Sequence, residues 1–344
     1  ALDIARQRAR RRGLEDKITW VRASLLDLPD SGLGPFDYIN CSGVLHHLDS
    51  PADGLAALTS VLKDDGALGL MLYGRYGRTG VYQMQQLMRL INHGEHRSRA
   101  MVENTKEVLA SLPNTNWLKR TPTLIGEKDQ LDDAEIFDIF LHAKDRPYSV
   151  LEVYDLLDRE NLHLVEFLYE ERAMYDYQFA FRGEGLQRQV ARLPRRYQQA
   201  AAELFWGTLD RHKFWASRHT DTTADARDPQ NVPVFSKLAE SIGMPESIVT
   251  TVNSSSLVWR PSIDARHGMT ISFNLELNDV NRQLVRLIDG RHTMGEIVRT
   301  ITSGADSPTA DENVWNLCCE TLESLRKFDF VVLHHESVPG IDKL

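Results

Sequence analysis

Hydrophobic positions in the first part of the chain fall into alternating helical and strand-like runs. Apolar residues recur at helical spacing over 2–12 and 48–61. Short runs rich in β-branched and aromatic residues occupy 18–22, 36–41 and 67–73. The last run is almost continuously apolar, as is typical of a parallel strand buried on both faces. Strands that alternate with helices predict an α/β fold with a parallel sheet.

The pattern continues beyond residue 80 with a helical insertion. Residues 81–111 and 132–143 are predicted to be mainly helical. Ser149 with Glu152 forms the capping-box signature of a further helix. The run 163–169 predicts a strand that returns to the sheet, and the first three strands are expected to be mutually parallel.

The remaining sequence divides into a connector and a small unit. Residues 184–217 are predicted to be mostly helical, and the polar, Thr- and Asp-rich stretch 218–233 suits a linker. We therefore expect a first domain at 1–175 with its insertion at 81–147, a helical connector and linker at 176–233, and a small domain at 234–344.

The small unit has clear helix start signals. Asn278 is placed to cap one helix, and Thr293 with Glu296 forms the capping box of a second. A third helix is expected over 311–327. Strands are predicted on either side of these helices, at 269–274 and 330–334. This arrangement resembles a winged-helix or PqqD-like peptide-binding domain.

Composition limits the classes of protein that the chain can represent. It has 344 residues with a formal net charge of -9, so no broad basic surface favours nucleic acid or an anionic membrane. Residues 270–335 hold ten acidic and six basic residues, a balance of -4 that disfavours DNA binding. No run approaches the length of a membrane-spanning helix. Three cysteines without metal-site spacing fit a reducing compartment, so we expect a cytoplasmic protein with no metal site.

The candidate chemistry lies in two loops that follow predicted strands. Residues 24–27 come after the first strand, and residues 41–45 after the second. In open α/β sheets, ligands bind beyond the carboxyl ends of the strands. The small residues Ser42 and Gly43 allow the backbone of the second loop to approach a ligand closely.

The stretch 36–48, with the sequence FDYINCSGVLHHL, and the following helix, glycine turn and strand resemble class I S-adenosylmethionine (SAM) dependent methyltransferases. The resemblance covers residues 1–75 well and 130–170 loosely. It implies a Rossmann-like sheet and SAM as the cofactor. It also implies which residues contact the cofactor. The first loop would flank the adenine with Ser24, Leu25 and Leu26, and the second would face SAM with Ser42 and His46.

The sequence departs from the family pattern in one respect. The glycine-rich loop that receives the methionine carboxylate and the acidic residue that holds the ribose are absent, and no GxGxG occurs. Residue 1 corresponds to the start of the family's second helix. We therefore expect the sheet to lack its first strands, and the present chain to bind SAM weakly and be inactive.

The acceptor is expected to bind against the insertion that follows the strand at 67–73. The polar candidates there are Tyr73, His142, Arg146 and Tyr148, because a loop fixed by proline holds them near the strand ends. An arginine in this place suits a carboxylate or phosphate.

Two further groups have both functional and structural interpretations. Glu135, Asp138 and His142 share one helical face, so they form either a metal or acid–base site or a solvated face. Cys41 ends a buried strand and is interpreted as a core residue rather than a nucleophile.

The leading functional hypothesis is methyl transfer from SAM to a protein, RNA or small molecule. An alternative is a catalytically inactive scaffold with the methyltransferase fold. A second alternative is a peptide-binding module, with peptide or protein contact through the C-terminal domain.

Overall fold

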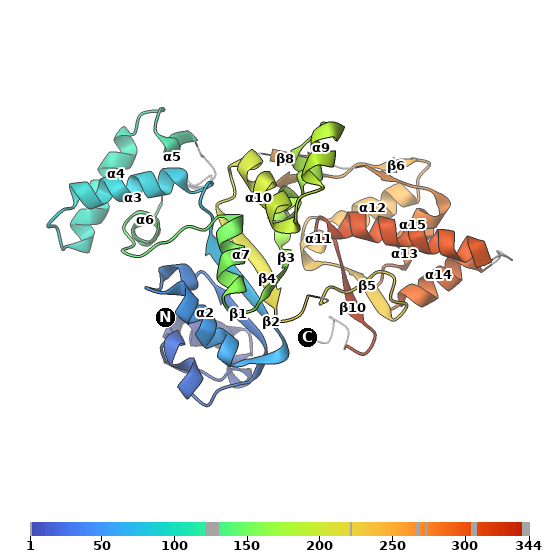
Figure 1. The fold of residues 1–344 in the computed structure, drawn as a ribbon, viewed down its shortest axis with the longest axis horizontal. Coiled ribbons are helices and arrows are strands. Elements are labelled where there is room, and N and C mark those ends of the chain that lie inside the picture. The colour runs from blue at the N-terminus through green and yellow to red at the C-terminus, as the bar shows by residue number, and fades with distance from the viewer. Residues whose placement is uncertain are drawn as a thin grey trace.

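The computed structural model describes residues 2–120, 131–220, 222–265, 269–272, 274–303 and 308–338. Its central feature is a four-stranded sheet in the order β1-β2-β4-β3 (Figure 1). β1 and β2 are parallel, and β4 is antiparallel to both of its neighbours. The predicted α/β class is therefore confirmed. The strands are β1 (Phe36–Ser42), β2 (Leu62–Tyr73), β3 (His163–Phe167) and β4 (Arg211–Ser217).

The core of the sheet lies along β2. Leu68, Leu70 and Leu72 are almost fully buried there, and Phe214 of β4 is buried beside them. Three helices contribute buried residues to the same core, namely α2 (Pro51–Ser60), α7 (Val150–Asp158) and α10 (Arg195–Trp206). Two of these helices begin at residues that are typical helix caps. Ser50 caps α2, and Ser149 with Glu152 forms the predicted capping box of α7.

The strand predicted at 18–22 does not form. Residues 18–24 are irregular, and Ile18 and Val21 are 40% and 48% exposed. A β-strand needs a partner for its backbone groups. Within the described residues β1 is the edge strand of the sheet, and residues 18–24 do not pair with it or with any other strand. Before this segment lie α1 (Leu2–Arg11) and the 3-10 turn η1 (Glu15–Lys17), and after it lies the 3-10 turn η2 (Leu25–Asp30).

The prediction of helix over 184–217 is wrong at its end. β4 occupies the last seven of those residues and pairs with strands on both sides. Its buried positions alternate, at His212, Phe214 and Ala216. That alternation is the strand signal which could have corrected the prediction. Tertiary pairing overrides the helical preference of the sequence before it.

The insertion folds as a helical lobe with its own hydrophobic core. The lobe comprises α3 (Thr79–Ile91), α4 (Ser98–Ser111), α5 (Trp117–Arg120) and α6 (Asp133–Phe140). In Figure 1 it extends from the carboxyl end of β2 away from the C-terminal part. Its buried residues form a cluster of their own, separate from the main core. This cluster consists of Val81, Met84, Met88, Val102, Leu118, Ile136 and Phe140.

Between β3 and β4 the chain forms the helical connector. It contains η5 (Tyr169–Tyr175), α8 (Tyr177–Ala180), α9 (Glu184–Val190) and α10. The expected linker ends in a strand, because β5 (Asn231–Phe235) pairs antiparallel with β10 (Val331–His335).

The C-terminal part combines helices with short two-stranded ladders. Asn278 and the Thr293–Glu296 capping box begin helices as predicted. The helices are α11 (Lys237–Ser241), α12 (Met244–Val252), α13 (Asp279–Leu287), α14 (Met294–Thr302) and α15 (Pro308–Arg326). The remaining strands are β6 (Val258–Trp259), β7 (Ser262–Ala265), β8 (Met269–Ser272) and β9 (Leu275–Glu276). The winged-helix assignment and the domain boundaries stay predictions.

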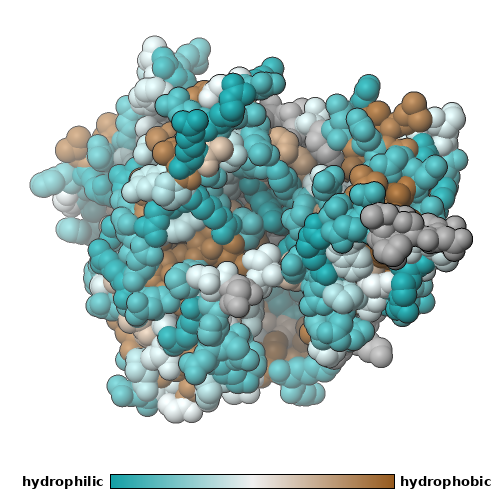
Figure 2. All heavy atoms as spheres, turned by 45° about the vertical axis from the view of Figure 1, so that its right-hand side comes forward, coloured by the Kyte–Doolittle hydropathy of each residue, from teal (hydrophilic) through white to brown (hydrophobic). Residues whose placement is uncertain are grey.

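The surface is largely hydrophilic, with separate apolar patches and a recess near the centre of the view in Figure 2. Within the described residues, no helix combines the length and apolar character needed to cross a membrane.

The outer edge of β1 leads to a first prediction. Tyr38 is 52% exposed on this edge strand and lies across Gly69 of β2. Exposed apolar edges promote pairing between molecules. We expect Tyr38→Lys to reduce the aggregated fraction at high concentration by roughly half, measured by light scattering. The same substitution at the exposed Tyr197 of α10 serves as the control. Equal aggregation of both variants and the unmodified chain would contradict the prediction.

Candidate functional site at the ends of β1 and β2

The carboxyl ends of the two parallel strands meet the loop that was expected to carry the acceptor site. The turn η3 (Leu45–His47) follows β1, and Tyr73 is the last residue of β2. The backbone N–H of Arg146 donates to the carbonyl of His46 at 3.1 Å, and that of Tyr148 donates to the carbonyl of Tyr73 at 2.8 Å. The loop 142–148 is therefore attached directly to both strand ends.

Five planar side chains form a continuous stack at this place. The ring of His46 lies 4.0 Å from that of Tyr73 and 4.2 Å from that of His47. His47 in turn lies 4.0 Å from His142. On the other side, the guanidinium carbon of Arg78 is 3.7 Å from the centre of the Tyr73 ring. We call this set, in the order His142, His47, His46, Tyr73 and Arg78, the ring stack.

His46 is the most unusual member of the ring stack. It is 1% exposed, and neither ring nitrogen has a hydrogen-bond partner in the described part of the chain. Burial, with smaller contributions from charged and imidazole neighbours, lowers its pKa to about 3. The imidazole is therefore neutral at physiological pH, with one nitrogen able to donate and the other to accept. An unpaired buried polar group costs free energy, and such groups mark places where a ligand or water completes the bonding.

A buried carboxylate anchors the cationic end of the ring stack. The side chain of Asp145 has no exposed area and lies 3.2 Å from a guanidinium nitrogen of Arg78. The hydroxyl of Tyr82 is 3.3 Å from this carboxylate, and the Gln85 amide donates to it at 2.9 Å. Burial is the main reason that the pKa of Tyr82 rises, so its phenol stays protonated. These contacts connect the helical lobe to the strand ends.

The sequence interpretation missed Asp145, Tyr82 and Gln85. Asp145 stands between Lys144 and Arg146, so it looks like one member of a mixed surface charge run. Its partner Arg78 stands just before α3 in the sequence YGRYGR, where nothing local shows that it is buried and therefore needs an acid beside it.

The residues expected to flank the adenine lie in the turn η2, which packs beside α2. The Ser24 hydroxyl caps this turn by accepting from the Leu26 N–H at 3.2 Å. Leu25 packs against the main core, whereas Leu26 is half exposed. Nearer the ring stack, the Ser42 hydroxyl donates to the side chain of Asn40 at 2.7 Å. Gly43, with a φ of +75°, makes the turn between β1 and η3.

Tyr148 contributes its main chain rather than its hydroxyl. Its ring is 1% exposed in the main core, and its hydroxyl has no partner among the described residues. Its carbonyl accepts from the N–H of Arg75 at 2.8 Å and from the His212 imidazole at 2.9 Å. Arg146 is exposed, with its guanidinium carbon 5.0 Å from the Tyr148 ring. Among the four predicted acceptor residues, Arg146 is therefore the most accessible.

The structure also bears on the two groups with alternative interpretations. Glu135 closes the capping box of α6 with Asp132, which is a structural role. In the part of the chain that the structure describes, no three His, Cys, Asp or Glu side chains are grouped to hold a metal. Burial raises the pKa of Cys41 to about 11, so its thiol remains protonated, as expected of a core residue.

The parallel strands and the loops at their carboxyl ends define an α/β fold of the Rossmann type, in which ligands commonly bind at these strand ends. Residues 1–68 match the family model of the methyltransferase domain. The resemblance to class I SAM-dependent methyltransferases is thereby confirmed for this part of the chain.

Two solved structures share the fold across most of the chain. PKMT2 from Rickettsia typhi has a TM-score of 0.55 and 13% identity, over 95% of this chain and 64% of PKMT2. The same protein in complex with AdoHcy gives a TM-score of 0.54 and 14% identity, over 92% of this chain and 61% of PKMT2. The match extends the confirmed fold well beyond residue 68.

One curated relative shows clearer sequence similarity. The uncharacterized protein syc1184_c of Synechococcus sp. (strain ATCC 27144 / PCC 6301 / SAUG 1402/1) is 36% identical over 150 residues, which are 43% of this chain and 36% of that protein. The chain thus spans about a third of the length of this relative and under two thirds of PKMT2.

Proposed function

We propose that the protein is a methyltransferase that uses SAM and binds its methyl acceptor at the ring stack. The observation that carries the proposal is His46, a buried neutral imidazole with two unpaired nitrogens at the carboxyl end of β1. The methyltransferase-domain match over residues 1–68 supports the same reaction, as does the AdoHcy complex of PKMT2, because AdoHcy is what remains of SAM after methyl transfer.

The loop after β1 fits the part of such a cofactor that it faces, whereas the glycine-rich loop and the acid that hold the methionine carboxylate and the ribose in this family are absent from the sequence. Gly43 turns the backbone at the strand end without a side chain, and the unpaired nitrogens of His46 lie just beyond it. When bound, SAM supplies the electrophilic methyl group. The chain supplies close approach and alignment, which is the main requirement of a displacement reaction.

The residues of the ring stack serve the acceptor in different ways. A histidine with a pKa of about 3 is a weak base, so His46 acts as a neutral hydrogen-bond partner. Asp145 and Arg78 hold the Tyr73 ring against it. The exposed Arg146 is the group that meets an anionic part of the acceptor.

The acceptor side of this proposal is tested with Arg146→Ala in the full-length protein. We expect turnover with labelled SAM to fall at least about tenfold, which is about 1.4 kcal/mol of transition-state stabilisation. SAM affinity should stay unchanged, because the substitution removes only an acceptor contact. Substrates are pooled protein, RNA and metabolite fractions.

Arg192→Ala is the matched control, since Arg192 is also exposed but lies in the connector. Normal turnover of Arg146→Ala would show that the loop 142–148 is only structural. Methyl transfer to none of the pools by the unmodified protein would instead favour the inactive scaffold.

A further inference from the structure

A cavity of about 460 Å³ lies away from the ring stack, beside the sheet-edge strand β3. It is lined by Glu166 of β3, by the segment 172–178, by the start of α10, and by Glu323 and Lys327 at the end of α15. We call it the β3 cleft. Its volume falls in the range of about 300–1,000 Å³ that is typical of small-ligand sites. No role in methyl transfer accounts for it.

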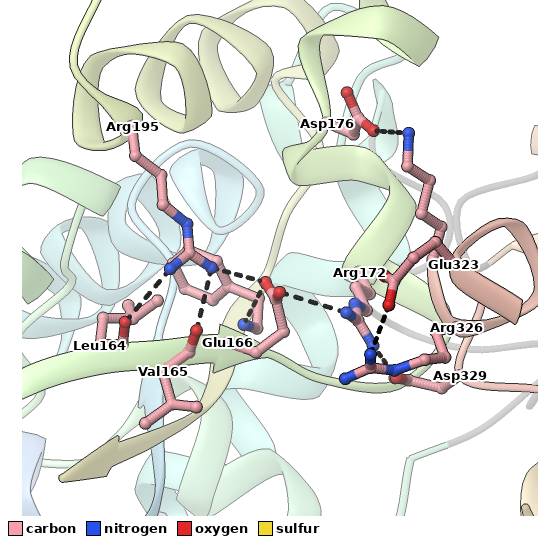
Figure 3. A network of polar contacts seen from close by, with 11 residues as sticks. Leu164, Val165, Glu166, Arg172, Asp176, Arg195, Glu323, Arg326 and Asp329 are labelled. Carbon is pink, nitrogen blue, oxygen red and sulfur yellow. Dashed lines mark hydrogen bonds and ion pairs between the residues drawn. The ribbon is translucent and has the colours of Figure 1, made fainter. Parts of the chain in front are cut away.

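Each charged side chain that lines the β3 cleft already takes part in an ion pair (Figure 3). Arg195 lies 3.0 Å from Glu166, and Arg172 bridges Glu166 at 3.2 Å and Asp329 at 2.7 Å. Lys327 lies 3.1 Å from Asp176. Three acidic residues and three basic residues line the cleft, so their formal charges cancel. They are Glu166, Asp176 and Glu323 against Arg172, Arg195 and Lys327.

This pairing selects against ligands that carry a single charge. Glu166 is shared by Arg172 and Arg195, so an anion that takes Arg195, or a cation that takes Glu166, has to break an existing ion pair. Glu166 is only 25% exposed and Arg172 only 18%, so breaking an ion pair at Glu166 costs more than it would at the surface. A neutral polar ligand meets no such cost.

The neutral groups that remain in the β3 cleft are mostly amides. Gln178 accepts from Lys327 and Gln199 accepts from the Tyr154 hydroxyl, which leaves the NH₂ of each without a partner in the described residues. Gln198 donates to two carbonyls and keeps its own oxygen for an acceptor role. Tyr177 adds a phenol. Such a set of donors and an acceptor matches the alternating N–H and C=O groups of a polypeptide main chain.

The edge of β3 is closed to simple strand addition. Arg195 donates to the carbonyls of Leu164 and Val165, at 3.4 and 3.0 Å. A peptide therefore has to lie on the side chains of the cleft rather than extend the sheet. The ring of Tyr175, which is buried beside the cleft, is stacked on Phe167, so one of its two faces is already covered.

We propose that the β3 cleft binds a short polypeptide segment through its main-chain amides. The site is formed jointly by the connector, β3 and the last helix of the chain. It is independent of the methyl-transfer proposal, because it shares no residue with the ring stack.

The test is titration of the full chain with N-acetyl-triglycine N-methylamide, followed by NMR of the glutamine side-chain amides. This probe carries a peptide main chain without charge or side chains. We expect saturable shifts that Tyr177→Phe/Gln178→Leu weakens about tenfold, because it removes two contacts. Both substitutions lie at the rim of the cleft, and circular dichroism checks that the fold is retained.

Gln86→Leu is the matched control, because Gln86 is an exposed glutamine of α3, far along the chain from the cleft, and should leave binding unchanged. Absence of saturable shifts, equal weakening by the control, or tighter binding of maltotriose than of the blocked peptide would each overturn the proposal. None of these outcomes affects SAM binding, so the two proposals fail separately.

Discussion

We expect Asp145→Ala to lower the free energy of unfolding by about 3–5 kcal/mol, the usual cost of removing one partner of a buried ion pair. The carboxylate is fully buried and the Arg78 side chain is only 6% exposed, so the substitution leaves a guanidinium in the interior without its counterion. It also removes acceptors from Tyr82 and Gln85. The measurement is urea denaturation followed by circular dichroism.

Asp138→Ala is the appropriate control. Asp138 is in α6 of the same lobe but is exposed, and a surface substitution usually changes stability by no more than about 0.5 kcal/mol. If Asp145→Ala costs no more than Asp138→Ala, Arg78 has another way to satisfy its charge, and the anchor described for the ring stack is wrong.

The second large effect is a loss of stability in mild acid caused by His46. Its pKa is about 3 in the folded chain, against about 6.5 when exposed. Above pH 6.5 the His46 imidazole is neutral in both the folded and the unfolded chain, so it does not change the free energy of unfolding. Below pH 6.5 this imidazole binds a proton in the unfolded chain but not in the folded chain. Stability therefore falls as the pH falls, by about 1.4 kcal/mol per unit and about 2 kcal/mol by pH 5.

His46→Phe isolates this contribution, because it keeps a ring in the stack and removes the titration. We expect its unfolding free energy to vary less with pH between pH 7 and 5 than that of the unmodified chain. His93→Phe, at an exposed histidine of the lobe, should retain the original pH dependence. If the unfolding free energy of all three proteins varied equally with pH, His46 would be protonated in the folded state.

The sequence predicted the sheet where neighbours in the chain were also neighbours in the fold. Residues 67–73 of β2 are almost continuously apolar, and Ser149 and Thr293 start helices through contacts three residues away. The sequence-based prediction failed where pairing with another strand decides whether a segment becomes a strand. Residues 18–22 have strand composition but no strand beside them, and β4 becomes a strand because β2 and β3 lie on either side.

The candidate site was only partly predictable for a similar reason. The family resemblance gave His46 as a cofactor contact, and Tyr73 and the loop 142–148 were expected at the strand ends on geometric grounds. The acid that anchors them, Asp145, comes from the loop 142–148, and its partners are Arg78 just before α3 and two side chains of α3, Tyr82 and Gln85. No local pattern records such a contact across 60 or more residues.

The separate core of the helical lobe has an evolutionary consequence. Val81, Met84, Phe140 and their neighbours pack among themselves, so substitutions there need no adjustment in the sheet. The polar attachment at Arg78 and Asp145 is confined to a small area. A lobe of different shape could therefore be exchanged onto the same strand ends by recombination, which would change what the protein recognises while its cofactor-facing half remains as it is.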